Sequence, residues 1–360
     1  MTPETLASLV EVVGEAHVST RHSDRLVYSV DASWVPQMTL DRGVATPQPD
    51  VIVHPGTAAE VAAILAIAHQ ARVPVVPWGG GSGTQGGTLP IHHGIVVDLK
   101  RLDQILEIDE TSLTVRAQAG INGAVLEWAL NERGLTLPHY PASAQCATLG
   151  GYLAPRGSGT ISTKYGKAED LVMSIEVALP DGLLIRTPGV PNHASGPDFM
   201  RLFLGSEGVF GVITEATMRI AKLPETRLFR ALLFPDVSAG LEAGRRMMVD
   251  RLDPLVIRMY DPHSTASLVK RVLGYELEGA YMIVGFDGWT EIAAAQEARA
   301  MQVAASLGAR DLGRELRLVP RVERRRSFEL DERCDVRGQG APQEDGDAHE
   351  REGRMSAPRR

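Results

Sequence analysis

The sequence predicts an α+β protein of about two domains, and three observations support this prediction. Strand-like and helix-like apolar patterns alternate from about residue 46 to residue 224. Three segments rich in glycine and other small residues interrupt this stretch. From about residue 225 to residue 312, strands and helices continue without glycine-rich loops. The hydrophobic content of 44% over 360 residues is sufficient for a buried core.

Residues 1–45 are predicted to form a lead that packs on the first domain rather than folding alone. One short helical pattern is followed by an irregular stretch that ends near Ser33. Met1 to Val13 has no basic region ahead of an apolar run, so it lacks the pattern of a signal peptide. No stretch approaches the ~20 apolar residues of a membrane span. We therefore expect a cytoplasmic protein with no transmembrane segment.

Charge and cysteine content limit the classes of partner. The net charge of -8 disfavours a nucleic-acid partner, because phosphate binding needs a basic surface. Cys146 and Cys334 suit neither a metal cluster nor a disulfide framework, so we expect no metal. Cys146 is predicted to be a small buried residue rather than a nucleophile, because no histidine or lysine is placed nearby to activate it. A small-molecule substrate fits this composition.

The first domain is predicted to span residues 46–224. Thr57 and Glu60 form a capping box that starts a helix between strands at 51–54 and 73–77. This β-α-β unit is most simply a right-handed crossover between parallel strands. The remaining predicted elements are strands at 95–99, 105–108, 113–117, 172–179 and 212–220 and a helix at 122–133.

A glycine run at residues 77–87 follows the second strand directly. Consecutive glycines let backbone N–H groups turn toward an anion with no Cβ in the way, and Ser82 and Thr84 can add hydroxyl donors. The ligand indicated is a pyrophosphate; the alternative is a flexible linker. The lysine of a Walker A loop is absent, and residues 88–90 do not open the helix that a Rossmann fingerprint needs.

Two further segments of small residues follow at 141–151 and 205–216, with 155–158 close behind the first. The segment at 141–151 could let a flat ligand approach the backbone, or it could be an ordinary surface loop. In the later segment a glycine turn leads into an apolar strand. Glu207 could act there as a general base or make a structural or cofactor hydrogen bond.

In this order the three segments resemble the FAD-binding domain of the vanillyl-alcohol oxidase and p-cresol methylhydroxylase family, from about Ser19 to Gly308. The resemblance implies a two-part FAD-binding domain of the p-cresol methylhydroxylase type, followed by a partial α+β cap domain. The glycine run would hold the pyrophosphate, 141–148 and 155–158 would line the isoalloxazine and ribityl side, and 207–213 would complete the adenine and pyrophosphate contacts.

The resemblance assigns cofactor binding to particular positions. They are Pro77, Gly79, Gly80, Gly81, Ser82, Gly83, Thr84, Pro141, Ser143, Thr148, Gly150, Gly151, Arg156, Ser158, Glu207, Gly208, Gly211, Val212 and Ile213. The glycine run lacks the histidine to which some relatives attach the flavin, so the resemblance implies non-covalent FAD.

Two branches of the family fit the chain. One oxidises small 2-hydroxy acids of the D-lactate or glycolate type by hydride transfer to flavin N5, and the other is alkyl-dihydroxyacetone-phosphate synthase. Residues 164–172, 194–198 and 256–261 look like the synthase, but Asn192 and His193 stand where it usually has an arginine. We expect an FAD-linked oxidoreductase of the first branch. A synthase-like enzyme, a non-catalytic FAD-binding remnant and half of a split enzyme are the alternatives.

Residues 225–312 are predicted to form the partial substrate cap. Strands are expected at 255–259 and 281–286, and helices at 241–250 and 291–307, the last capped by Thr290. Arg258 is the candidate anion contact for a substrate, with a surface or structural salt bridge as the alternative. The sequence assigns no catalytic residue.

Residues 313–360 are arginine-rich, lack lysine and show no apolar period, so the sequence predicts an irregular tail. Either a natural disordered segment or a shifted reading frame would give this pattern. The resemblance then implies that the C-terminal part of the family fold is missing, which would leave the chain weak or inactive alone. A separate chain supplying that part and a homodimer are both left open.

Overall fold

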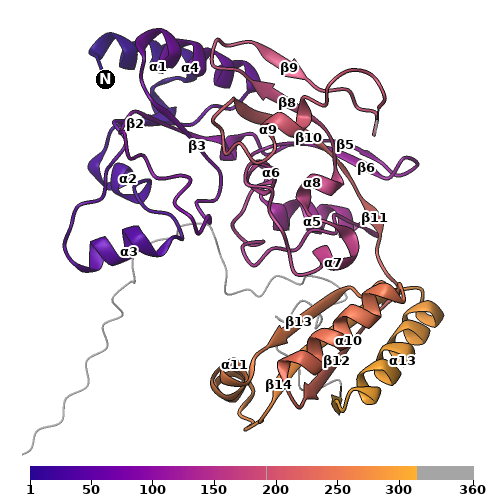
Figure 1. The fold of residues 1–360 in the computed structure, drawn as a ribbon. Coiled ribbons are helices and arrows are strands. Elements are labelled where there is room, and N and C mark those ends of the chain that lie inside the picture. Colours follow the sequence, from indigo (N-terminus) through magenta and orange to yellow (C-terminus); the bar gives the residue numbers. More distant parts are fainter. Residues whose placement is uncertain (192, 314–360) are drawn as a thin grey trace, which may run out of the picture. The chain divides into compact units, whose positions relative to one another are not determined.

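A four-stranded sheet holds the glycine run (Figure 1) in the computed structural model, which describes residues 1–191 and 193–313. The strand order is β1-β2-β4-β3, with β1 (Val18–Ser19), β2 (Val51–Val53), β3 (Val75–Trp78) and β4 (Ile95–Asp98). Both β2 and β3 run parallel to β4, which lies between them. The two strands of the predicted β-α-β unit are therefore parallel but not adjacent. Every residue of β2 and β4 is buried, as expected for parallel strands covered on both faces.

Helix α4 (Ala58–Ala71) begins where the capping box predicts. Thr57 is the N-cap and its side chain accepts a hydrogen bond from the backbone N–H of Glu60 at 3.1 Å. The Glu60 carboxylate accepts from the backbone N–H of Gly56 at 2.6 Å, one residue before the N-cap. The apolar stripe of α4 packs against α1 (Pro3–Val13), where Leu9 is fully buried with Val61.

The lead is more regular than the sequence predicted. Besides α1 it contains η1 (Glu15–His17), α2 (His22–Val27) and α3 (Trp34–Asp41), and β1 pairs antiparallel with β2. The prediction of an irregular stretch after one helix was wrong. Short polar contacts stabilise these elements, such as the bond from Ser19 Oγ to the Asp24 carboxylate at 2.6 Å, and such contacts leave no apolar period in the sequence.

A five-stranded antiparallel sheet forms the second part of this region. Its order is β5-β6-β10-β8-β9, with β5 (Ile105–Asp109), β6 (Thr114–Gln118), β8 (Val172–Ala178), β9 (Leu184–Arg186) and β10 (Val212–Arg219). One face packs on helices in a core that includes Val115, Leu126, Leu149 and Ile175. The helices are α5 (Gly123–Asn131), α6 (Leu149–Leu153), α7 (Ser162–Tyr165), α8 (Ala168–Leu171) and α9 (Met200–Phe203). A short pair joins β7 (Leu135–Thr136) to β11 (Ala221–Lys222).

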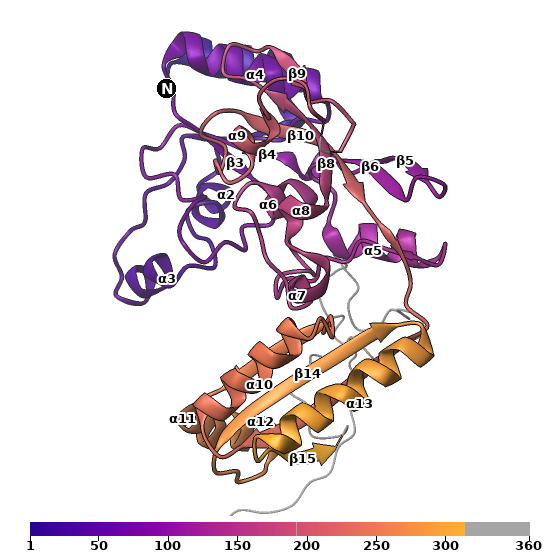
Figure 2. The same cartoon turned by 45° about the vertical axis from the view of Figure 1, so that its right-hand side comes forward.

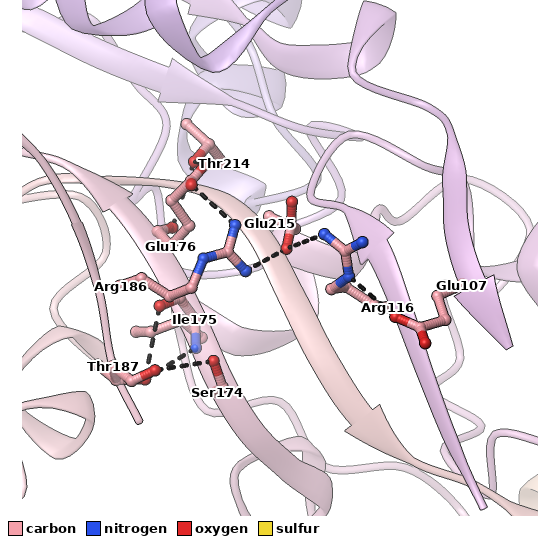
Figure 3. A network of polar contacts seen from close by, with 9 residues as sticks. All are labelled: Glu107, Arg116, Ser174, Ile175, Glu176, Arg186, Thr187, Thr214 and Glu215. Carbon is pink, nitrogen blue, oxygen red and sulfur yellow. Dashed lines mark hydrogen bonds and ion pairs between the residues drawn. The ribbon is translucent and has the colours of Figure 1, made fainter. Parts of the chain in front are cut away.

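An ionic ladder crosses the other face of this sheet (Figure 3). The Glu215 carboxylate accepts from Arg116 Nη1 at 3.2 Å and from Arg186 Nη1. Arg186 also binds Glu176 at 2.9 Å, and Arg116 lies 3.5 Å from Glu107. Burial would raise the pKa of Glu215, but the hydrogen bonds and charges of the two arginines outweigh it and lower that pKa.

A third sheet has the antiparallel order β13-β14-β12-β15, with β12 (Thr226–Phe234), β13 (Val256–Tyr260), β14 (Ala280–Gly288) and β15 (Arg310–Gly313). Helices α10 (Val237–Val249) and α13 (Thr290–Ser306) run along β14 (Figure 2) and share a core with Met282, Val284 and Phe286. Between β13 and β14 lie α11 (Pro262–Ser264), a π-helical turn η3 (Thr265–Val269) and α12 (Lys270–Leu273). The predicted α+β fold class is confirmed.

Strand β12 escaped prediction although it is central in this sheet. Arg227 and Arg230 break its apolar pattern, yet each has a buried acidic partner: Asp287 at 3.5 Å and Glu297 at 2.9 Å. From the sequence alone, an arginine that pairs with a buried acid cannot be distinguished from an arginine exposed to solvent.

The predicted cap of α13 was also wrong. Trp289 is its N-cap, and Thr290 is the first helical residue. Thr290 donates through its backbone N–H and its hydroxyl to the Glu225 carboxylate, at 3.2 and 3.3 Å. A carboxylate 65 residues away thus stabilises the helix terminus, which no local pattern reveals.

Of the predicted tail at 313–360, Gly313 ends β15 and residues 314–360 lie outside the described residues. Within the part that the structure describes, no helix is long and apolar enough to cross a membrane.

The ionic ladder gives a stability prediction. Glu215→Ala leaves two arginines without their shared, mostly buried partner, and we expect the free energy of unfolding to fall by about 2–4 kcal/mol. Glu107→Ala is the control, since its side chain is 62% exposed and such a pair contributes within about 1 kcal/mol. Urea unfolding at pH 7 measures both; equal losses in the two variants would contradict the assignment.

Candidate functional site

Three parallel strands end at one edge of the first sheet, and the residues after them define the candidate site. His54 follows β2, Gly79 follows β3, and Lys100 lies just after β4. Trp78 pairs with Asp98 in register, so the chain leaves β3 and β4 at the same level. Ligands of parallel α/β sheets bind beyond the carboxyl ends of the strands, which is where this fold places the glycine run.

The glycine run leaves β3 without forming a helix, as the sequence predicted. Gly81 has φ +61°, and a Cβ on it would lie 2.5 Å from the Trp78 ring. Ser82 is half-buried, while Gly83 and Thr84 are exposed. A Cβ on Gly83 would meet nothing within 4 Å. The run is therefore tight at its base and open at its tip, where a ligand can reach its N–H groups.

The segment at 141–151 packs directly against the base of the run. A Cβ on Gly79 would overlap Oγ1 of Thr148, and one on Gly80 would overlap the backbone carbonyl oxygen of Cys146. Thr148 is the N-cap of α6 and accepts from the backbone N–H of Gly151 at 3.2 Å. The structure thus brings the first two predicted segments into backbone contact.

The other predicted residues of this segment build its turn and its anchorage. Pro141 is buried, and the Ser143 carbonyl accepts from the Cys146 N–H at 2.9 Å. Gly150 is buried, and a Cβ there would lie 3.0 Å from the Ala119 side chain. These positions fix the backbone behind the glycine run.

The segment at 207–213 lies against both ends of the run. The Glu207 carboxylate lies against Gly87, and a Cβ on Gly208 would lie 2.6 Å from Pro77. Glu207 itself has φ 51°. The hydrogen-bonding and general-base roles of Glu207 both stay predictions.

Three further predicted residues of that segment lie at the start of β10. Val212 and Ile213 are buried, at 2% and 7% exposure. A Cβ on Gly211 would lie 2.7 Å from a methyl of Val177. Only their backbone groups can therefore face a ligand.

The Arg156 guanidinium is engaged within the protein. Its Nε lies 3.0 Å from the Glu169 carboxylate and donates to the Leu204 carbonyl at 3.0 Å. Arg156 therefore holds the turn that leads into Gly205 and the third segment. Ser158, two residues on, is exposed.

No pattern in the sequence indicated His139 as a site residue. Its ring is 6% exposed and packs at 4.6 Å on the ring of Tyr152. Among the described residues, neither ring nitrogen has a hydrogen-bond partner. Burial lowers the pKa of His139 to about 4, so the ring is neutral at pH 7. Buried polar atoms are rarely left unpaired, so His139 is a candidate polar contact for a bound molecule or water.

The prediction for Cys146 was wrong, because this residue is exposed. A helical turn directs its N–H and Sγ toward the Ser143 carbonyl. Cys146 lines a cavity of about 170 Å³ together with Lys100 and Thr148. A cysteine within a segment of small residues is readily predicted to be buried, but here the Cys146 side chain forms part of the wall of a pocket.

Arg258 lies on β13, away from the three segments in the sequence, and is exposed. Its guanidinium carbon lies 5.3 Å from the ring centroid of Tyr260. Among the described residues it makes no hydrogen bond or ion pair, so the salt bridge that was its alternative role has no partner here.

The region that contains Arg258 contacts the region before residue 224 through a buried carboxylate, that of Asp287. Asp287 accepts from Lys164 Nζ at 2.9 Å and from the Tyr165 hydroxyl at 3.1 Å. Its side chain is 0% exposed. Two residues of the stretch at 164–172 thus bind β14.

Two family profiles match the chain. One, described as FAD binding domain, matches residues 49–188, and the other, described as FAD linked oxidases, C-terminal domain, matches residues 223–328. The second match extends past Gly308, where the sequence resemblance was placed.

Individual proteins agree with the profiles. Glycolate oxidase subunit GlcD of Bacillus subtilis (strain 168) is 33% identical over 303 residues, which cover 80% of this chain and 62% of that protein. Alkyldihydroxyacetonephosphate synthase of Caenorhabditis elegans is 37% identical over 217 residues, or 59% of this chain and 36% of that protein. The chain spans less than two thirds of each of these relatives.

Solved structures show the same fold. An alkyldihydroxyacetonephosphate synthase superimposes with TM-score 0.77 at 28% identity, covering 87% of this chain and 61% of that one. A p-cresol methylhydroxylase superimposes with TM-score 0.70 at 16% identity, covering 86% and 65%. This chain therefore belongs to the FAD-linked oxidase family and has the FAD-binding fold of p-cresol methylhydroxylase.

Proposed function

We propose that the chain binds FAD non-covalently at the carboxyl edge of the first sheet. The observation that supports this most strongly is the backbone contact of Gly79 and Gly80 with residues 146–148, with Glu207 against Gly87 at the other end of the run. This arrangement leaves the N–H groups at the tip of the run free for a pyrophosphate. The absence of a histidine from residues 77–87 argues for non-covalent binding.

The proposed contacts fall into three groups. Gly79 to Thr84, with Pro77 behind them, would hold the pyrophosphate. The segments at 141–151 and 156–158 would line the isoalloxazine and ribityl side, with the unpaired nitrogens of His139 as a polar contact. Glu207, Gly208 and the backbone of 211–213 would complete the adenine and pyrophosphate contacts.

We propose further that the reaction is the oxidation of a small 2-hydroxy acid. FAD, when bound, supplies the two-electron acceptor. Arg258 is exposed, has no acidic partner within residues 1–191 and 193–313, and would bind the substrate carboxylate. Support comes from the sequence match to the glycolate oxidase subunit, which covers 80% of this chain, whereas the sequence match to the synthase covers 59%.

A synthase-like reaction is the second candidate. The synthase structure superimposes over 87% of this chain, and residues 164–172 resemble that branch. Asn192 and His193 stand where the synthase usually has an arginine, which argues against a phosphate-bearing substrate.

The FAD proposal predicts a sharp difference between two glycines of the run. Gly80→Val forces the run away from the Cys146 carbonyl, and we expect FAD affinity to fall by ~100-fold or more, about 3 kcal/mol. Gly83→Ala meets open space and should bind within about twofold of the wild type. Quenching of flavin fluorescence during titration with FAD measures both.

Circular dichroism confirms that Gly80→Val is folded before its affinity is interpreted. Acid precipitation of the loaded wild type should release all flavin into the supernatant. Flavin retained in the pellet would contradict non-covalent binding, and equal affinity of both glycine variants would contradict the site.

The substrate proposal predicts that D-lactate or glycolate bleaches the bound flavin under anaerobic conditions. Arg258→Ala should raise the half-saturating substrate concentration by about 10–100-fold, because a charged hydrogen bond is lost. Arg271→Ala, an exposed arginine of α12, should leave it unchanged. If the chain binds FAD but no 2-hydroxy acid reduces it, the substrate proposal is contradicted. A synthase-like enzyme, a non-catalytic FAD-binding remnant or half of a split enzyme would then be favoured. Exchange of an acyl for an alkyl chain would identify the synthase-like enzyme among these.

His139 gives a prediction about pH. Its pKa of about 4 in the folded protein lies below the ordinary value of about 6.5. The unfolded chain therefore binds more protons between these values, and stability falls as the pH drops from about 6.5 toward 4. Without FAD, His139→Phe should remove up to about 3 kcal/mol of this loss.

Denaturant unfolding at pH 7 and pH 4.5 tests this, with His92→Phe as an exposed control. The same loss of stability in wild type and His139→Phe would show that the ring is not buried in its neutral form.

A further inference from the structure

The glycine run lacks a cation of its own. Residues 77–87 contain no lysine, arginine or histidine, although a pyrophosphate is an anion. Backbone N–H groups supply oriented partial charges, but a full positive charge nearby adds attraction that they do not provide. The same edge of the sheet supplies one.

Lys100 occupies that edge. Strands β3 and β4 are parallel neighbours, and Trp78 pairs with Asp98 at their carboxyl ends. Lys100 lies two residues beyond Asp98, in the 3₁₀ turn η2 (Leu99–Arg101). Its Nζ donates to the carbonyl oxygen of Gly79, the first glycine of the run, at 3.4 Å. The carboxyl ends of two adjacent strands thus place the glycine run and the Lys100 ammonium group beside each other.

Buried partners hold this ammonium in position. Lys100 Nζ lies 2.7 Å from the Asp98 carboxylate, which is 1% exposed. The Tyr28 hydroxyl donates to the same carboxylate, and the Tyr28 ring centroid lies 5.5 Å from Nζ. His54 Nδ1 lies 3.6 Å from Asp98. Asp98 and Gly79 occupy two of the three N–H groups of Lys100, and the side chain remains 49% exposed to a ligand.

A cavity beside Lys100 is lined by two residues that contact the run. The cavity of about 170 Å³ is lined by Lys100, Cys146 and Thr148, and the last two are the residues that press on Gly79 and Gly80. Asp103 also lines it. The cavity is therefore not uniformly positive, and an anion fits at its Lys100 side, next to the run.

We propose that Lys100 binds the pyrophosphate of the dinucleotide as its counter-charge, with Asp98 positioning the ammonium. This inference rests on the proposed FAD site and adds a positively charged side chain beside the glycine run, which has none of its own. A lysine acts here as a point charge rather than a bidentate clamp.

Affinity and salt dependence together test the proposal. Lys100→Met should raise the dissociation constants of FAD and ADP by about 10-fold, while Lys100→Arg, which keeps the charge, should stay within about threefold. Added NaCl should weaken wild-type binding more steeply than Lys100→Met binding, because one ionic contact is gone. Lys222→Met removes an exposed lysine of β11 and should behave as the wild type.

The outcomes separate this inference from the FAD proposal. A wild type that binds FAD, with the same affinity and salt slope in Lys100→Met, overturns the role of Lys100 alone. A wild type that binds neither FAD nor ADP overturns both. If Lys100→Met is unstable because Asp98 loses its partner, the double variant Asp98→Asn/Lys100→Met removes that unpaired charge and gives the same comparison.

Discussion

The site depends on a steric constraint, the close contact of the backbone at Gly79 and Gly80 with Thr148 and the Cys146 carbonyl. Gly80 lies where any Cβ would overlap the Cys146 carbonyl, and Gly79 lies similarly against Thr148. Substituting either glycine would push the run away from the 141–151 segment. The contact therefore fixes the distance between the proposed pyrophosphate loop and the segment proposed to line the flavin. Glycine is needed here because of its missing side chain more than for its flexibility.

Three buried carboxylates stabilise the elements around that contact by joining side chains from different strands and helices. Asp98 fixes Lys100 and Tyr28 at the sheet edge, Glu215 joins two arginines across the second sheet, and Asp287 accepts from Lys164 and Tyr165. Each is mostly removed from water, and each has at least two donors. Removing one partner from such a group costs far more than losing an exposed pair. These acids therefore position the site as well as stabilising the fold.

His139 departs from this pattern of satisfied groups. Its ring is as buried as those carboxylates, yet both nitrogens lack partners among the described residues. It precedes Pro141 in the segment proposed for the flavin, and it packs on Tyr152 of α6. A polar group kept buried and neutral is available to a bound molecule without first giving up another hydrogen bond. This makes the segment at 139–151 both a wall and a polar contact of the proposed site.

The sequence by itself determined the order of the glycine segments, the α+β class and the start of α4, because these depend on local features. A capping box, a helical apolar stripe and a run of residues without Cβ leave their pattern within a few neighbours. Tertiary structure decided the rest. Strand β12, the Thr290 contact with Glu225, the exposure of Cys146 and the places of His139 and Lys100 depend on partners distant in the chain. The energy of a buried charge or an unpaired ring is set by those partners, which a single sequence does not display.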